Sequence, residues 1–312
     1  MSIIKEYIEE YLNDNSEQNI RNLLAQLVVA DIWVPCSTVL SEADQKRFEK
    51  MVDEAQENGQ DLEGTIFKTQ DDMHLVPDLL ENEKGDLVFP VFSSEEEMGE
   101  YGENFSNVEM TFMEAMRMAE NNPQNPIGIV INAFSRSFFI SKEIFGSIDE
   151  IAEARQAEIS SLDVAIPFNF VKADSMEGDP EGSIPFSVRT EQTDALLFYI
   201  ESDLEGAIPL GATEMITDVL NQQFAGTDES LVEVKEDKTA EGLPYIYYIS
   251  KTEEESSGDK YRLRCEIRLS DKCVNLDTYF EERFQSSEKD ETSPGHPLQM
   301  ARDLVEFICQ NN

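Results

Sequence analysis

Apolar residues repeat with helical spacing at the start of the chain. Within residues 3–12 they recur three and four positions apart, which predicts a short amphipathic helix with a single apolar stripe. A second helix is predicted to follow Ser16, because its hydroxyl suits an N-cap and leucines line one side of the next two turns. The chain then becomes extended over residues 31–35, where we expect Pro35 to end regular pairing.

The pattern changes period further along. Residues 41–63 are charged and polar, and both a helix and a flexible excursion fit them. Apolar positions then alternate, which predicts strands at 65–67, 73–77 and 86–92 and a turn at 82–85. A meander is the simplest arrangement of these strands.

Helices and strands alternate up to about residue 155. Ser93 or Ser94 is a candidate N-cap, followed by three glutamates that the helix dipole favours in a first turn. The pattern predicts further elements, in chain order a helix at 111–120, a buried strand at 127–132, its hairpin partner at 138–140 and a helix at 141–155.

The second half begins at about Leu162 and has the same mixture. Three antiparallel strands are expected in its later part, separated by turns rich in glycine and acids. The predicted elements are strands at 184–189 and 195–200, a helix at 212–224 capped by Thr213, strands at 229–235, 244–250 and 261–269, and a terminal helix at 297–310.

The length of 312 residues suggests two domains, at roughly 150 residues each. The segment 150–161 between the halves is charged, as expected of a bridge. We therefore predict an α/β or α+β protein with domains at residues 1–158 and 159–312. In each domain a mixed or antiparallel sheet packs with helices.

One run resembles a known family. Residues 87–97 read Leu-Val-Phe-Pro-Val-Phe-Ser-Ser followed by three glutamates, similar to a segment of the SseB N-terminal domain, found in bacterial proteins named for enhanced serine sensitivity. The residues before it (23–35) and after it (129–140) fit the same order of elements, so the resemblance covers about residues 15–148. Residues 132–135, Asn-Ala-Phe-Ser, depart from the family's Asn-Pro-x-Gly. The resemblance implies an α/β domain without an established catalytic mechanism.

The second half has a weaker similarity, of topology alone. Its order of strand, strand, helix, three strands and helix resembles the α/β sandwich of the PsbP or DcrB type.

The chain is strongly acidic, and this narrows its partners. Asp and Glu number 65 against 24 Lys and Arg, so 24 − 65 gives a net charge of −41. A nucleic acid or an anionic membrane would be repelled unless cations clustered, and the sequence shows no such cluster. The N-terminus lacks a secretory pattern and no apolar run reaches the roughly 20 residues of a membrane span, so we expect a cytoplasmic protein.

Cysteine and histidine do not form a recognisable site. We expect the four scattered cysteines, Cys36, Cys265, Cys273 and Cys309, to be buried reduced thiols. Only His74 and His296 exist, too few for a typical zinc site. An acid and base set of Asp71, Asp72 and His74 is conceivable, but an ordinary exposed histidine fits better, and His296 fits a turn before a helix.

Two other groups have plain structural interpretations. The acids Asp174, Glu177, Asp179 and Glu181 could collect calcium, but their spacing matches no EF-hand loop and a solvated turn fits better. The helically spaced Met113, Met116 and Met118 fit core filling, although methionine also suits adaptable binding faces. The serine-nucleophile, P-loop and dinucleotide motifs are absent. The sequence therefore predicts no catalytic, cofactor-binding or metal residue and no cofactor.

These observations favour a protein-binding or regulatory module of the SseB type over an enzyme. The alternatives are a hydrolase whose site is assembled from distant residues, and an acidic immunity or inhibitor protein for a basic partner. A deep pocket with a buried, shifted carboxylate or histidine would favour the enzyme, and an exposed apolar patch rimmed by acids would favour the binder. Ligand, pathway and oligomeric state are left open.

Overall fold

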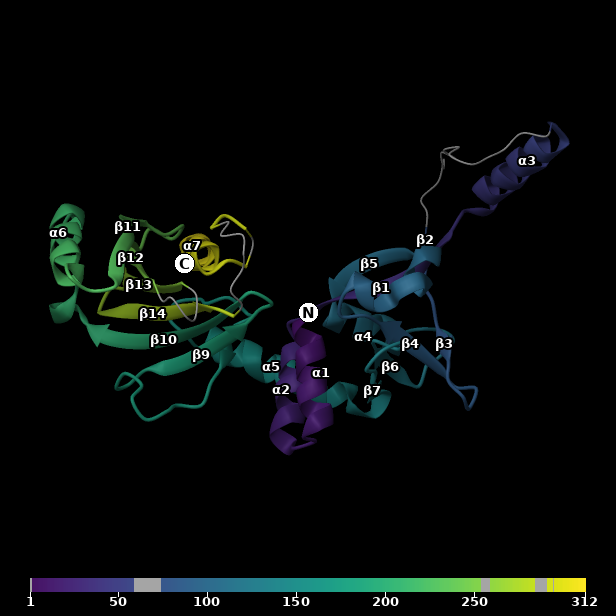
Figure 1. Ribbon diagram of the computed structural model, residues 1–312, viewed down its shortest axis with the longest axis horizontal. Helices are drawn as coiled ribbons and strands as arrows, with labels where there is room; N and C mark the ends of the chain where they lie inside the picture. Colours follow the sequence, from purple (N-terminus) through teal and green to yellow (C-terminus); the bar gives the residue numbers. More distant parts are fainter. Residues whose placement is uncertain (1, 59–73, 254–258, 284–290, 294) are drawn as a thin grey trace. The chain divides into compact units, whose positions relative to one another are not determined.

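The computed structural model describes residues 2–58, 74–253, 259–283, 291–293 and 295–312. The chain divides into two compact units, Ser2–Glu150 and Ile151–Asn312, here called the N-terminal and C-terminal units (Figure 1). Each combines helices with antiparallel or mixed sheets, which confirms the predicted fold class. That residues 1–158 and 159–312 fold as separate domains stays a prediction.

The N-terminal unit contains two small sheets. Its helices are α1 (Ile3–Asn13), α2 (Glu17–Leu27), α3 (Glu42–Asn58), α4 (Phe112–Glu120) and α5 (Phe145–Ser160), the last continuing into the C-terminal unit, with 3₁₀ segments η1 (Glu95–Asn104) and η2 (Lys142–Ile144). Its strands are β1 (Asp31–Val39), β2 (His74–Pro77), β3 (Leu80–Glu81), β4 (Leu87–Val91), β5 (Ser106–Thr111), β6 (Gly128–Ile131) and β7 (Phe138–Ser141). The sheet orders are β2-β1-β5 and β3-β4-β6-β7.

Local signals explain several of these helices. The Ser16 hydroxyl accepts a hydrogen bond from the Asn19 amide, as predicted for an N-cap. Thr111 and Glu114 form a reciprocal capping box at the start of α4, which satisfies two amide groups that the first turn leaves free. The 3₁₀ segment η1 begins after Ser94, where a helix was expected, and Gly99 interrupts it with a φ of 53°.

The prediction that Pro35 ends regular pairing is wrong. Pro35 lies inside β1 and is paired with Asn107 of β5. Two residues earlier, Trp33 exchanges two backbone hydrogen bonds of 2.8 Å with Phe92 across the opposite edge of β1. Pro35 faces that same edge of β1. At this point the chain segment beside β1 changes from the residues after β4 to those around β2, and the Pro35 carbonyl accepts a hydrogen bond from the Asp78 amide. The missing N–H therefore falls at a change of partner, where proline costs little.

The predicted meander is also wrong. β2 pairs with β1 in one sheet, whereas β3 and β4 form a hairpin in the other, and β4 is parallel to β6. The hairpin of β6 and β7 is confirmed. The undecided segment 41–63 is helical over α3, from Glu42 to Asn58. Residues 59–63 lie outside the described residues, as do the strand predicted at 65–67 and the beginning of the one at 73–77.

The C-terminal unit is built on one antiparallel sheet in the order β11-β12-β13-β14-β10-β9-β8. Its strands are β8 (Val171–Lys172), β9 (Ile184–Arg189), β10 (Thr193–Asp203), β11 (Glu229–Lys238), β12 (Pro244–Thr252), β13 (Lys260–Arg268) and β14 (Lys272–Glu282), and its other elements are η3 (Leu204–Gly206), α6 (Thr213–Phe224) and α7 (Pro297–Asn311). α7 lies across one face of the sheet, and α6 packs beside β11 (Figure 1).

The core of this unit lies between the sheet and α7. Leu197, Leu263 and Ile249 from the strands and Ala301 and Ile308 from α7 are fully buried there. The helices at 212–224 and 297–310 and the strands at 184–189, 195–200, 229–235, 244–250 and 261–269 agree with the structure within a few residues.

Two details of the prediction for this unit fail. Strand β14 was missed, although it is central and pairs with both β13 and β10. Its alternation of Val274, Leu276 and Phe280 with polar residues was the signal that would have identified it. Thr213 is not the cap of α6, because Ala212 occupies the N-cap position without a side-chain hydrogen bond.

Candidate functional site

An aromatic cluster reaches the surface of the N-terminal unit at the loop between β6 and β7. The ring of Phe134 is stacked on the buried ring of Phe92 at a centroid distance of 5.8 Å and lies 4.9 Å from that of Tyr101. The ring of Phe105 also packs against that of Tyr101, at a centroid distance of 4.9 Å. Phe134 is nevertheless 54% exposed, so the cluster presents an apolar face to solvent.

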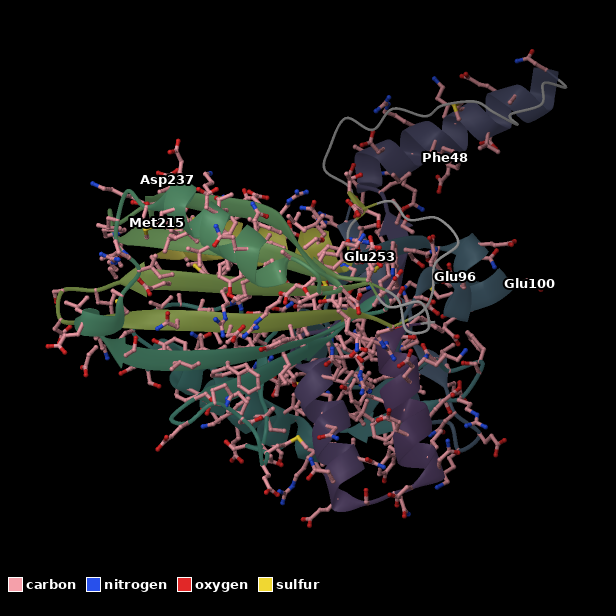
Figure 2. All side chains as sticks on the ribbon, turned by 60° about the vertical axis from the view of Figure 1, so that its left-hand side comes forward. Phe48, Glu96, Glu100, Met215, Asp237 and Glu253 are labelled. Atoms are coloured by element: carbon pink, nitrogen blue, oxygen red, sulfur yellow. The ribbon has the colours of Figure 1, made fainter. Side chains whose placement is uncertain are left out.

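A shallow hollow beside Phe134 is bordered by charged residues. Its lining combines Tyr101 and Phe134 with residues of α1, η1 and the β6–β7 loop, namely Lys5, Glu96, Glu97, Met98, Gly99, Glu100 and Ser135. Glu96 and Glu100 are exposed at its rim and belong to η1 (Figure 2). The rim therefore carries three glutamates against one lysine. This surface is called the acidic aromatic hollow below.

A buried asparagine sets the loop that carries Phe134. Asn132 is fully buried and has a φ of 53°, in the left-handed region that asparagine tolerates better than most residues. Its side-chain oxygen accepts from the Ser93 amide and its amide group donates to the Ser93 hydroxyl, both at 2.9 Å. The loop is therefore tied to the turn that opens η1.

Glu97 makes a second tie across the hollow. It accepts from the Lys5 ammonium at 2.6 Å and from the Ser135 hydroxyl at 2.5 Å. Burial acts to raise the pKa of Glu97, but the hydrogen bonds from Lys5 and Ser135 together hold that pKa below its ordinary value. Tyr101 is fixed by donating its hydroxyl to Asp78, and burial followed by this hydrogen bond raises the pKa of Tyr101. The aromatic rings are thus held by polar groups from four segments.

The histidines do not form a catalytic site. His74 is exposed on β2, as predicted for an ordinary surface residue, and Asp71 and Asp72 lie outside the described residues. His296 is the N-cap of α7, and its Nδ1 accepts from the Leu298 amide at 3.2 Å. Burial lowers the pKa of His296, consistent with a neutral ring in that structural role.

The other predicted residues are dispersed. In the acidic loop the carboxylate of Asp179 accepts from the Met176 amide, and no group of three or more metal-ligating residues occurs anywhere in the described part of the chain. Three of the cysteines are buried and Cys309 is half-buried, all as free thiols. Met116 is in the core, whereas Met113 and Met118 are only half-buried.

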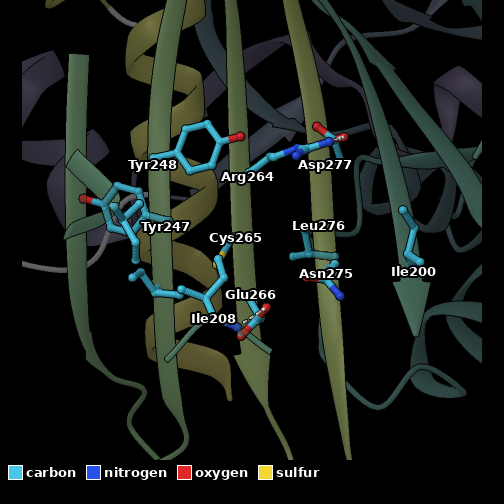
Figure 3. A pocket seen from close by; sticks show the side chains of 12 residues that line it. Ile200, Ile208, Tyr247, Tyr248, Arg264, Cys265, Glu266, Asn275, Leu276 and Asp277 are labelled. Atoms are coloured by element: carbon cyan, nitrogen blue, oxygen red, sulfur yellow. Dashed lines mark hydrogen bonds and ion pairs between the residues drawn. The ribbon is translucent and has the colours of Figure 1, made fainter. Parts of the chain in front are cut away.

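A cavity of about 330 Å³ lies in the C-terminal unit, between the sheet and the segment leading into α6 (Figure 3). It contains a buried carboxylate, Glu266, whose pKa is raised by burial. Both oxygens of Glu266 are within hydrogen-bond distance of the Ile208 amide, at 3.0 and 3.2 Å, and Arg268 lies 3.4 Å away. The Glu266 carboxylate therefore binds a backbone segment, which argues against a role as a general acid or base.

Comparison with known protein families gives a match over most of the N-terminal unit. Residues 4–143 match the family model described as the SseB protein N-terminal domain, which confirms the resemblance inferred over 15–148. Every residue of the acidic aromatic hollow lies within this match. No curated protein matches the chain.

Two solved structures are similar to the chain. One is cyanobacterial PsbP (CyanoP) from Synechocystis sp. PCC 6803, at 13% identity and a TM-score of 0.28, covering 46% of this chain and 79% of that one. The other is the Ran-binding protein Mog1p of Saccharomyces cerevisiae, at 14% identity and a TM-score of 0.28, covering 47% of this chain and 89% of that one. In the described residues no helix has the length and apolar character that crossing a membrane requires.

The sequence analysis missed the hollow. Its residues come from three segments that are far apart in the chain, and only Phe134 carried a local signal. It is a large apolar residue in the short connection between the two predicted hairpin strands, where a polar residue is usual.

Proposed function

We propose that this protein is a binding module of the cytoplasm and that its acidic aromatic hollow receives a basic segment of a protein partner. The observation that carries the proposal is the exposed ring of Phe134 within a rim of glutamates. Large exposed aromatic residues are enriched at protein interfaces, because they bury much apolar area for little loss of conformational entropy.

The chemistry of the hollow suits a lysine or arginine side chain. Aromatic faces attract a cation through their quadrupole, by about 0.5–1 kcal/mol at exposed sites and more when water is excluded. The carboxylates of Glu96 and Glu100 add charge complementarity at the rim. The net charge of −41 extends this attraction to longer range and raises the rate of encounter with a basic partner.

A hydrolase is the less favoured alternative. The buried and shifted Glu266 is the kind of group that would favour an enzyme, but the Ile208 amide and Arg268 already engage it. The buried histidine, His296, caps a helix. Both groups therefore have structural roles, which supports a binding function.

Affinity capture from native extract tests the proposal when two matched variants accompany the wild type. Phe134→Ser removes the exposed ring of the hollow. Phe139→Ser removes a ring of similar exposure, 45%, from β7 outside it. We expect a basic protein to be retained by the wild type and by Phe139→Ser and to be lost from Phe134→Ser.

The captured protein then allows a kinetic test. Reversing Glu96 and Glu100 to lysine should slow its association several-fold, whereas reversing Glu83 and Glu109, two exposed acids outside the hollow, should slow it less. The association rate should also fall steeply with salt, since screening acts over about 8 Å at physiological ionic strength. Equal retention by Phe134→Ser, or an association rate that ignores salt, would contradict the proposal.

A further inference from the structure

Strand register builds the floor of the cavity in the C-terminal unit, on the face of the sheet opposite α7. Tyr248, Arg264 and Asp277 are direct cross-strand neighbours on β12, β13 and β14, so their side chains share this face. The next row on the same face runs from β12 to β10 through Ile246, Glu266, Asn275 and Ile200. Figure 3 shows the polar Tyr248–Arg264–Asp277 group at one end and Ile208 and Glu266 at the other.

The roof of the cavity is held in place by two carboxylates. It is formed by Ile208, from the segment before α6, and by Ile216 of α6. The Ile208 amide donates to Glu266, and the Gly211 amide lies 2.9 Å from both oxygens of Glu236. These tethers fix the segment over the sheet, so the cavity is preformed. Its walls carry four isoleucines, Ile200, Ile208, Ile216 and Ile246.

The polar end has more cationic than anionic groups. Arg262 donates hydrogen bonds from its Nε and Nη2 to the Asp277 carboxylate, at 2.8 and 2.6 Å. Arg264 donates to the same carboxylate from its own Nε and Nη2, at 3.2 Å each. One carboxylate thus serves two guanidinium groups. Within the described residues, neither Nη1 of Arg264 nor the Tyr248 hydroxyl has a hydrogen-bond partner, and the Arg264 side chain is half exposed.

The other charges around the cavity lie in the next row of the sheet, away from this end. Glu266 lies at the opposite end with Arg268 as its partner at 3.4 Å. Glu236, which holds the Gly211 amide of the roof, is in the same row, so the cationic excess is confined to the polar end, where Arg262 and Arg264 share Asp277. A chain with a net charge of −41 thus has a local cationic excess beside an apolar cavity.

We propose that this cavity binds a small amphipathic carboxylate, with its apolar chain against the isoleucines and its carboxylate on Nη1 of Arg264 and the Tyr248 hydroxyl. Arginine suits this task because its planar donors remain charged and match carboxylate geometry. The volume of about 330 Å³ lies at the small end of ligand pockets, which favours a short chain. The proposal is independent of the acidic aromatic hollow, which lies in the other unit.

Calorimetry on the full chain with three eight-carbon probes tests the ligand class. Octanoate has the apolar chain and the carboxylate, 1-octanol has the chain without charge, and octylammonium reverses the charge. We expect octanoate to bind at least tenfold more tightly than 1-octanol and octylammonium not to bind. Equal binding of octanoate and 1-octanol, or no binding of octanoate, would overturn the proposal.

Two arginine variants locate the site. Arg264→Gln should weaken octanoate about tenfold and leave 1-octanol unchanged. Arg262→Gln is the matched control, because it removes the same charge from the same strand and the same carboxylate, but Arg262 packs over the Tyr279 ring and does not line the cavity. Octanoate should bind this control within about threefold of the wild type. An equal loss in both variants would overturn the site.

A cavity-filling variant supplies a test that does not depend on charge. Ile216→Phe should block the cavity and abolish binding of both octanoate and 1-octanol, with circular dichroism confirming the fold. A peptide with a free C-terminal isoleucine serves as a competitor. If the peptide binds and octanoate does not, the carboxylate belongs to a protein terminus and the small-molecule proposal fails.

Discussion

The two concave surfaces of this protein are built in opposite ways. The acidic aromatic hollow of the N-terminal unit is assembled from loops and helix ends and is held by side-chain ties such as Asn132–Ser93. The cavity of the C-terminal unit has a floor of regular strands, on which register alone brings Tyr248, Arg264 and Asp277 together. The first carries an excess of acids and an exposed ring, and the second has, beside its isoleucines, two arginines that share one carboxylate. Net charge therefore does not predict local charge.

The strongest test of the comparison is whether the two units are independent. Leu263→Ala in β13 and Ile129→Ala in β6 each remove a fully buried side chain, which should cost about 2–5 kcal/mol in the unit that carries it. Hydrogen exchange measured by mass spectrometry should show lost protection in that unit alone. Residues 1–158 expressed alone should be folded by circular dichroism. Deprotection of both units by one substitution, or an unfolded fragment, would refute the prediction of separate domains.

The hydrogen bonds that hold the loop of the hollow should contribute nearly as much to the free energy of unfolding. Asn132→Ala removes two hydrogen bonds, leaves the buried Ser93 amide unsatisfied and places alanine at a positive φ, for about 2–4 kcal/mol in total. Asn132→Gly should recover about 1 kcal/mol of this loss, because glycine adopts that φ freely. Denaturant unfolding measures both values. Equal stability of the two variants would show that backbone conformation at this position carries no cost.

Removing the charge of Asp277, the carboxylate that Arg262 and Arg264 share, should destabilise the protein less and should also change ligand binding. Asp277→Asn leaves Arg262 and Arg264 facing each other without compensation, and since both are partly exposed the cost should be about 1–3 kcal/mol. The cost should shrink with added salt, which screens the repulsion. Calorimetry should show octanoate binding several-fold more tightly, because Arg264 is released from Asp277. Weaker octanoate binding in a folded variant would contradict the assignment of Arg264.

The smallest expected effect is the pH dependence of the tie at Glu97. Its folded-state pKa lies below the ordinary value of 4.5, so the stabilisation is present above that pH and is lost as pH falls through the folded pKa. At neutral pH, Glu97→Gln should cost no more than about 1 kcal/mol, since the Lys5 partner is partly exposed. The difference between wild type and variant should shrink as the pH falls below 4.5 in denaturant unfolding. A stability difference that grows on acidification would contradict the predicted direction of the Glu97 pKa shift.

The sequence predicted the elements better than their partners. The capping chemistry at Ser16 and the run of tyrosines and isoleucines in residues 244–250 are local signals, and the structure agrees with both. The partner of β1 is not local, since β1 pairs with β5 some seventy positions later, and the choice depends on which faces bury each other. The prediction at Pro35 failed for the same reason, because proline disrupts a strand only where a neighbouring strand would need a backbone N–H at that position.

The sites were harder to predict than the fold. The hollow requires Lys5, Glu97 and Ser135 to meet, and no spacing in the chain indicates it. The cavity did leave a trace, because residues 260–264 read Lys-Tyr-Arg-Leu-Arg and place three cations on one face of a strand. The sequence analysis found no cationic cluster, and the structure explains part of this failure. Each of these cations meets an acid from β14, which lies next to β13 only in the folded sheet.

The run of strands from β11 to β14 has a consequence for the order of folding. Each strand pairs with the next one along the chain, so these hairpins close short loops and lose little chain entropy in doing so. The pairing of β14 with β10 instead closes a loop of about seventy residues that contains the roof segment and α6. Contacts of low sequence separation form faster. The floor of the cavity should therefore be in place on β12 to β14 before Ile200 and the roof arrive, and a nascent chain would acquire its arginine pair before it could hold a ligand.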